Sequence, residues 1–168
     1  MGDFKDLTRQ EAIEKIKDLA TGTDICMFAT SLTQLPLIVR PMSTMQVDEE
    51  GNLWFFSKKS SEKNREILAD KRVQLFYASR NSSEYLSLYG EASISTDKNK
   101  AEEIWSPIVK AWFTEGINDP ELTLIKVVPH DSYYWDTKHN RLISLIKIAA
   151  ATVTGTTMDD GVEGKLKL

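Results

Sequence analysis

The sequence predicts a mainly β protein, a β-barrel with peripheral α-helices. Short apolar runs of strand length recur along the chain, and turn signals such as Glu49-Glu50-Gly51-Asn52 separate them. Helical periodicity is confined to segments near the two ends and to two connections. Because helices and strands alternate too sparsely for a doubly wound parallel sheet, we expect an antiparallel barrel of six or so strands.

Length, charge and cysteine content set the broad class of protein. A chain of 168 residues fits a single domain over 1–168 and can bury a core without disulfides or metals. Cys26 is the only cysteine, so no intramolecular disulfide can form. No apolar run is long enough to span a membrane, and a net charge of −4 argues against sequence-independent nucleic-acid binding. We therefore expect a cytoplasmic protein that binds neither membranes nor nucleic acids.

The first predicted element is a helix over 8–21. Thr8 and Glu11 form a capping-box pattern at its start. The apolar residues that follow recur at helical spacing, and they are Ile13, Ile16 and Leu19. The helix is expected to end near Gly22.

The barrel is predicted over 25–136. Its expected strands are apolar runs or alternating segments. They cover 25–30, 45–48, 53–57, 73–78, 84–95 and 122–128, and a further strand begins at 37–39. The alternation over 84–95 is nearly strict, which predicts a long, half-buried strand. Pro129 is expected to interrupt the ladder of the last strand, because proline has no N–H to donate.

Two connections carry helix signals. Ser60 or Ser61 can cap a short helix that closes at Asp70. A second helical stretch is expected to start at Asp97, with Pro107 as its interruption.

The C-terminal part of the chain is predicted to hold one more amphipathic helix, over 141–154. Gly155 stops this pattern. The remainder, 156–168, has the composition of a tail.

The stretch LPLIVRPMSTM, residues 35–45, places a cation and a proline inside an otherwise apolar, extended run. Pro41 is tolerated only at a sheet edge, a strand end or a bulge. Packing does not call for Arg40 in such a run, so its guanidinium is a candidate for a functional role.

Outside this stretch, neither the histidines nor the common catalytic and nucleotide-binding motifs indicate a site. His130 and His139 have no cysteine or other partner at metal-ligand spacing, so we expect no metal site. The sequence contains no GxGxxG after a strand, no Walker loop and no GxSxG elbow. Hydrolase and nucleotidase functions are therefore not indicated.

A cluster of cations surrounds the expected N-terminal end of the short helix that Ser60 or Ser61 caps. A helix N-terminus with free N–H groups, a hydroxyl from Ser57 and an ammonium from Lys58 or Lys63 forms a ready phosphate site. Arg40 could add a planar donor fork from the neighbouring strand. The alternative is a solvated basic surface, which is the interpretation we favour for Lys59 and Arg65.

Aromatic residues come directly before this cluster. Trp54, Phe55 and Phe56 suit a buried strand, and this explanation must hold for at least one strand face. A large flat ligand with a phosphate tail also needs an apolar wall beside an anion site. Met42 could pack against such a ring system.

The order of these motifs resembles a known family. A strand with Arg40-Pro41-Met42 is followed by Leu53-Trp54-Phe55-Phe56-Ser57, by Lys58-Lys59-Ser60-Ser61-Glu62-Lys63 at the start of a helix, and by two strands over 73–92. This arrangement is similar to the pyridoxamine 5'-phosphate oxidase-like FMN-binding split barrels, and more narrowly to their general stress protein branch. The resemblance covers about residues 8–136, and the predicted final helix also fits that branch.

The resemblance implies a fold, a cofactor and a set of site residues. The fold would be a six-stranded antiparallel split barrel of the FMN-binding type, and FMN would lie at the interface of a homodimer. The residues implied to bind the cofactor share the two strands and the helix start named above, and they are Arg40, Pro41, Met42, Phe56, Ser57, Lys58 and Lys63. Among these, Lys63 would bind the phosphate.

The resemblance also implies a redox function, with departures from the oxidases proper. Tyr85 stands where oxidase members often have a glutamine, and Glu62 stands where they often have a second base. No arginine matches the one that true oxidases carry near their C-terminal end, so oxidation of vitamin B6 is not expected.

The expected function is a flavin-dependent oxidoreductase of the general stress protein type, with a small-molecule electron donor and acceptor and no catalytic residue from the protein. Trp112, Trp135 and Tyr85 either shape the open face of the flavin or pack as core or interface aromatics. The alternatives are a non-catalytic flavin-binding stress or sensor module, or a protein that binds a deazaflavin coenzyme or haem.

Overall fold

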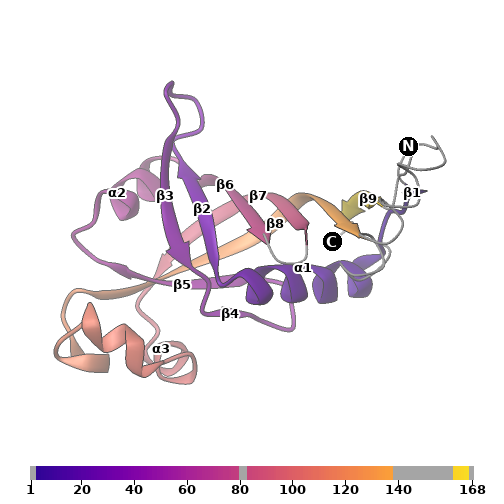
Figure 1. The fold of residues 1–168 in the computed structure, drawn as a ribbon. Coiled ribbons are helices and arrows are strands. Elements are labelled where there is room, and N and C mark those ends of the chain that lie inside the picture. The colour runs from indigo at the N-terminus through magenta and orange to yellow at the C-terminus, as the bar shows by residue number, and fades with distance from the viewer. Residues whose placement is uncertain (1–2, 80–82, 138–160, 167–168) are drawn as a thin grey trace, which may run out of the picture.

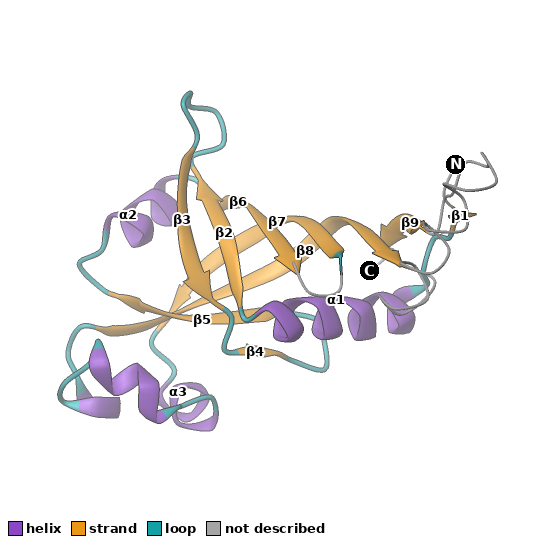
Figure 2. Cartoon of the chain, viewed as in Figure 1, coloured by secondary structure: helices purple, strands orange, loops and turns teal. Residues whose placement is uncertain are grey.

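The fold is a strongly curled, mainly antiparallel β-sheet with helices at its ends (Figure 1). The computed structural model describes residues 3–79, 83–137 and 161–166. Helices gather at the rims of the sheet and leave much of its outer surface open (Figure 2).

Within these described residues, nine strands form the sheet, and seven of them follow the order β1-β9-β8-β7-β6-β2-β3. Strand β5 also pairs with β8, and β4 pairs with β5. The strands are β1 (Asp3–Phe4), β2 (Ile25–Thr30), β3 (Ile38–Ser43), β4 (Gln46–Val47), β5 (Leu53–Lys58), β6 (Arg72–Ser79), β7 (Glu84–Ser95), β8 (Leu122–Thr137) and β9 (Gly161–Leu166). The helices are α1 (Arg9–Thr23), α2 (Glu62–Ala69) and α3 (Lys98–Glu103), with 3-10 helices η1 (Pro107–Ala111) and η2 (Gly116–Asn118).

The predicted split-barrel fold is confirmed, with a larger strand count. Each of the seven segments expected as strands contains a strand, β2 to β8. The two further strands, β1 and β9, come from the two ends of the described chain and pair with each other, which raises the total to nine.

Helix α1 forms where the capping-box pattern predicts it. The Glu11 carboxylate accepts hydrogen bonds from the backbone N–H of Thr8 at 3.1 Å and from the Thr8 hydroxyl at 2.8 Å. The face that α1 buries includes the three predicted apolar residues, and its buried residues are Ala12, Ile13, Ile16, Leu19 and Ala20. Helix α1 thereby covers one end of the barrel.

Strand β8 is continuous through Pro129, which differs from the expected interruption. Pro129 lies opposite Gly90 of β7, and the register between the two strands shifts between Tyr89 and Gly90. His130 has no strand-pairing partner in β7 and is the extra residue of a β-bulge, and proline is tolerated at such a bulge inside a sheet. The first part of β8 pairs with β5 and the last part with β9, so the bulge lies where β8 changes its second partner.

The C-terminal prediction needs correction in part. Residues 156–168 were expected to be a tail, but Gly161–Leu166 form β9 between β1 and β8. Val162 and Leu166 pack on the core, and Gly164 allows the backbone at Lys5 to approach closely. The predicted helix over 141–154 lies outside the described residues.

The main core fills the barrel between the sheet and α1. Phe28 and Phe55 meet at its centre in an edge-to-face contact, with ring centroids 5.4 Å apart. A smaller apolar cluster lies under α3 and consists of Trp54, Ala101, Ile104 and Leu124. Within the described residues, no helix combines the length and apolar character that a membrane span requires.

Candidate functional site

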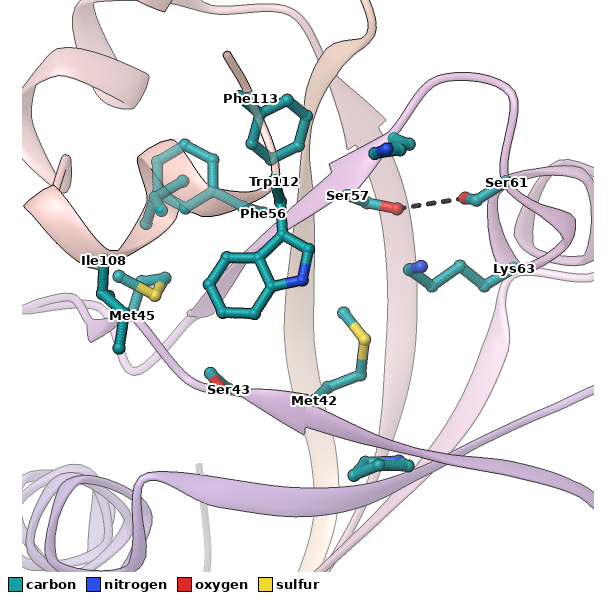
Figure 3. Close-up of a pocket in the computed structure, with 13 residues that line it drawn as sticks. Met42, Ser43, Met45, Phe56, Ser57, Ser61, Lys63, Ile108, Trp112 and Phe113 are labelled. Carbon is teal, nitrogen blue, oxygen red and sulfur yellow. Dashed lines mark hydrogen bonds between the residues drawn. The ribbon is translucent and has the colours of Figure 1, made fainter. Parts of the chain in front are cut away.

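A pocket of about 360 Å³ opens between strands β3 and β5. Its walls come from β3, from the end of β5, from the start of α2 and from the segment around η1 (Figure 3). The residues that line it are Pro41, Met42, Ser43, Met45, Phe56, Ser57, Lys58, Ser61, Lys63, Ile108, Val109, Trp112 and Phe113. The pocket therefore lies at the split of the barrel, where β3 ends the sheet.

Hydrogen bonds fix the corner between β5 and α2. The buried Ser57 hydroxyl donates to Asn64 Oδ1 at 2.7 Å and lies 3.2 Å from the hydroxyl of Ser61, the N-cap of α2. Asn64 Nδ2 in turn donates to Thr123 Oγ1 at 3.0 Å, and Thr123 donates to the Ser57 carbonyl at 2.7 Å. The two pocket hydroxyls are thus held in place by groups behind them.

Lys63 brings a positive charge to this corner without a carboxylate bound to it. Its ammonium points into the pocket from α2 (Figure 3). Partial burial lowers the pKa of Lys63, and repulsion from Arg40 and Lys58 lowers it further against the attraction of Glu66. In the described part of the chain, the ammonium group of neither Lys63 nor Lys58 forms an ion pair or donates a hydrogen bond. An anion in the pocket would relieve this unfavourable burial of charge.

Arg40 lies behind the pocket and is committed to α2. Its two terminal nitrogens donate to Thr30 Oγ1 at 3.0 Å and to Glu66 Oε2 at 2.8 Å. Thr30 also donates to the Glu66 carboxylate, at 2.5 Å. Burial alone would raise the pKa of Glu66, but the hydrogen bonds from Thr30 and Arg40 lower it overall. The guanidinium in the apolar strand is therefore explained by an ion pair that ties β3 to α2.

Aromatic side chains form the wall of the pocket away from Lys63. The ring of Phe56 meets Trp105 edge to face at 5.6 Å and lies 6.2 Å from Phe113. Met42 of β3 faces these rings across the pocket (Figure 3). The pocket thus has a cationic end with hydroxyls and an apolar end suited to a flat ring.

The structure brings six of the seven predicted site residues together. Pro41, Met42, Phe56, Ser57, Lys58 and Lys63 all line the pocket. Arg40, the seventh, does not line it, and its role toward a ligand stays a prediction.

The aromatic and basic residues next to the predicted site residues in the sequence lie partly in the core, partly on the surface and partly in the pocket. Trp54 and Phe55 are buried, as a strand interior requires, and only Phe56 of the three aromatics reaches the pocket. Lys59 and Arg65 are exposed, and Arg65 pairs with Glu62, as expected for a solvated surface.

Four lining residues from η1 and the two positions after it were not in the predicted set. They are Ile108, Val109, Trp112 and Phe113. Their paired apolar spacing is visible in the sequence, but only the fold shows that this segment reaches across to β3. Trp112 had been named as a residue that could face an open ring, and it does line the pocket.

The other residues that might carry chemistry lie elsewhere. His130 is exposed and lies 3.8 Å from Glu91, and no group of potential metal ligands occurs among the described residues. His139 is outside the described residues. Cys26 is buried in the core, and burial raises the pKa of its thiol to about 12.

The sequence and the fold match known proteins. The pyridoxamine 5'-phosphate oxidase like family matches residues 11–159. Protein bli-3 of Neurospora crassa is 23% identical over 155 residues, which cover 84% of this chain and 74% of that protein.

Two solved structures illustrate the likeness of fold. A protein of Jannaschia sp. CCS1 described as general stress protein 26 has a TM-score of 0.80 at 24% identity, over 95% of this chain and 99% of its own. The general stress FMN/FAD binding protein of Xanthomonas citri has a TM-score of 0.64 at 24% identity, over 74% of this chain and 87% of its own. The curled antiparallel sheet is therefore a shared architecture.

Proposed function

The chain belongs to the pyridoxamine 5'-phosphate oxidase like family, and we propose that it is an FMN-binding flavoprotein of the general stress protein type. The observation that carries this proposal is the division of one pocket into two ends. Lys63 supplies an unpaired, partly buried cation at one end, and Phe56 with Trp112 supplies an aromatic wall at the other.

The residues of the pocket fit FMN in chemistry and in order. The phosphate would be held by Lys63 and Lys58, beside the N-terminus of α2. The ring would lie against Met42 and the aromatic wall. The Xanthomonas citri protein of the same fold is described as FMN/FAD-binding, which supports this choice of ligand.

The protein's own part in the reaction is to bind, orient and shield. FMN, when bound, supplies hydride and electron transfer between small molecules. Among the described residues that line the pocket, the titratable side chains are the two lysines, which we assign to the phosphate, so we assign no acid, base or nucleophile to the chain. We therefore propose a flavin-dependent oxidoreductase in which position and charge, rather than a catalytic side chain, come from the protein. The departures at Tyr85 and Glu62 argue against oxidation of pyridoxamine 5'-phosphate.

We also propose that the protein acts as a homodimer with the cofactor at the subunit interface. Apolar residues on the outer face of the sheet are unusually exposed, including Ile25 at 52%, Met27 at 46% and Phe76 at 43%. Met27 lies between Phe76 and Pro41 in the strand register, and Pro41 also lines the pocket. A second copy on this face would cover apolar surface and reach the edge of the ligand site.

An absorbance spectrum of the freshly purified protein in the near-ultraviolet and blue tests the proposed ligand. We expect the bands of oxidised flavin, and their loss when NADH or NADPH is added. Turnover of an artificial acceptor would support the oxidoreductase. A flavin spectrum without turnover across donors would favour the sensor module, whereas a Soret band without flavin would contradict the proposal.

A further inference from the structure

The segment 107–113 has one buried side and one exposed side. Val109 and Phe113 are each only 3% exposed, whereas Ile108 is 66% and Trp112 is 58% exposed. The backbone N–H groups of Trp112 and Phe113 both donate to the Val109 carbonyl, at 3.0 and 3.3 Å. The turn is therefore anchored by one pair of side chains and presents the other pair outward.

The exposed indole faces the pocket. Trp112 projects into its middle, between Phe56 and Met42, and the Lys63 ammonium approaches from the opposite side (Figure 3). A tryptophan is a large apolar group, and leaving more than half of it exposed forgoes much of the stabilisation that burial would give. A flat ligand against the indole would recover that stabilisation.

The other aromatic rings of the pocket are already engaged. Phe113 is buried and contacts Phe56, and Phe56 contacts Trp105 edge to face. Among the described residues that line the pocket, Trp112 is the aromatic side chain with the largest exposed fraction. It is thus the ring best placed to stack.

We propose that Trp112 is the stacking residue of the site and selects ligands with a planar aromatic ring. This inference rests on the proposed flavin site and names the residue that recognises the ring. Lys63 binds the anion, so the two ends of the pocket bind two separate parts of one ligand, the ring and the phosphate. Stacking on an aromatic side chain is commonly worth a factor of ten or more in affinity.

FMN and riboflavin distinguish the two ends, because they share the ring and only FMN carries the phosphate. We expect Trp112→Ala to weaken both ligands by about tenfold, since the lost stacking is common to both. We expect Lys63→Glu to weaken FMN by at least tenfold and to leave riboflavin nearly unchanged. Equilibrium dialysis of each ligand against each variant measures the four ratios.

Two further variants separate stacking from a folding defect. Trp112→Phe keeps a ring and is expected to recover most of the lost affinity for both flavins. Leu68→Ala, on the exposed surface of α2 and outside the pocket, is the matched control and should bind like the unaltered protein.

The outcomes distinguish this inference from the proposed function. If the unaltered protein binds neither FMN nor riboflavin, the flavin site itself is wrong. If the unaltered protein binds FMN, and Trp112→Ala binds FMN and riboflavin as tightly as the unaltered protein does, Trp112 is not the stacking residue. Equal losses in Trp112→Ala and Trp112→Phe also overturn the inference, because the ring would then not matter.

Discussion

At the scale of single residues, the neighbouring cations Arg40 and Lys63 differ in their ion pairing. Arg40 has its charge matched by Glu66, whereas Lys63 has no carboxylate bound to it among the described residues. The sequence predicted the Lys63 end of the site because Ser57, Lys58 and Lys63 are close along the chain. The Arg40–Glu66 pair could not be predicted, because it joins a strand to a helix and depends on how α2 packs across the barrel.

Lys63→Glu is expected to lower FMN affinity by at least tenfold, about 1.4 kcal/mol. The change replaces a partner of the phosphate with a repelling charge. A glutamate in the first turn of α2 also suits the helix dipole, so the free protein should keep or raise its melting temperature. Fluorescence titration and thermal unfolding measure the two effects. Unchanged affinity would place Lys63 outside the ligand site.

The affinity for FMN is expected to depend on pH in two directions. Burial and nearby cations lower the pKa of Lys63, so its charge and its hold on the phosphate are lost as the pH rises through that lowered pKa. On the acid side, the phosphate becomes a monoanion below about pH 6 and binds less tightly.

Lys63→Arg tests the alkaline limb, because arginine stays charged throughout. We expect this variant to keep its affinity at alkaline pH while the unaltered protein loses it. Titrations at several pH values measure this difference. The same alkaline decline in both proteins would assign the decline to another group.

At the scale of elements, periodic segments were predicted well and segments defined by distant partners were not. Helix α1 and strand β7 follow from regular apolar spacing, and the N-cap of α2 is Ser61, one of its two predicted caps. Strand β9 was missed because it is short and polar with two glycines, and its strand form depends on β1 and β8. Pro107 begins a 3-10 turn rather than merely ending a helix.

The bulge between β7 and β8 gives a prediction about Gly90. A Cβ at Gly90 would lie 2.4 Å from the Val128 carbonyl oxygen, which is backbone and cannot move aside alone. Gly90→Ala is expected to lower the free energy of unfolding by about 1–3 kcal/mol, as overpacking does. Urea unfolding measures the change.

Gly22→Ala is the matched control for Gly90→Ala. Gly22 lies in the last turn of α1. Apart from its two chain neighbours and the backbone of its own helix, no atom lies within 4 Å of a Cβ added there. Alanine should raise the free energy of unfolding by about 0.5 kcal/mol, because it restricts the unfolded chain. Effects of the same sign in both variants would contradict the close approach at Gly90.

At the scale of the whole molecule, the sequence predicted the barrel but not which of its surfaces stay open. The outer sheet face carries exposed apolar side chains from three adjacent strands, β3, β2 and β6. Alternation within one strand indicates which residues share a face, but not whether a helix covers it. That information comes only from the packing of α1 and α2 at the rims (Figure 2).

Phe76→Glu tests the proposed dimer. A charge on the apolar outer face should be costly to bury against a second copy, so the variant is expected to sediment as a monomer at micromolar concentration. Leu68→Glu alters a residue that is 76% exposed on α2, away from this face, and should leave the dimer intact. A monomeric unaltered protein would contradict both the dimer and a ligand site between subunits.

Pro41 also affects how the exposed edge of the sheet can pair with other chains. Strand β3 is a terminal strand of the sheet, and such strands invite endless addition of other chains. Proline is tolerated there when its nitrogen faces away from the neighbouring strand, and it then offers an incoming chain no hydrogen to bind. We therefore expect Pro41, which also lines the pocket, to make this edge of the sheet less able to pair with a strand of another chain.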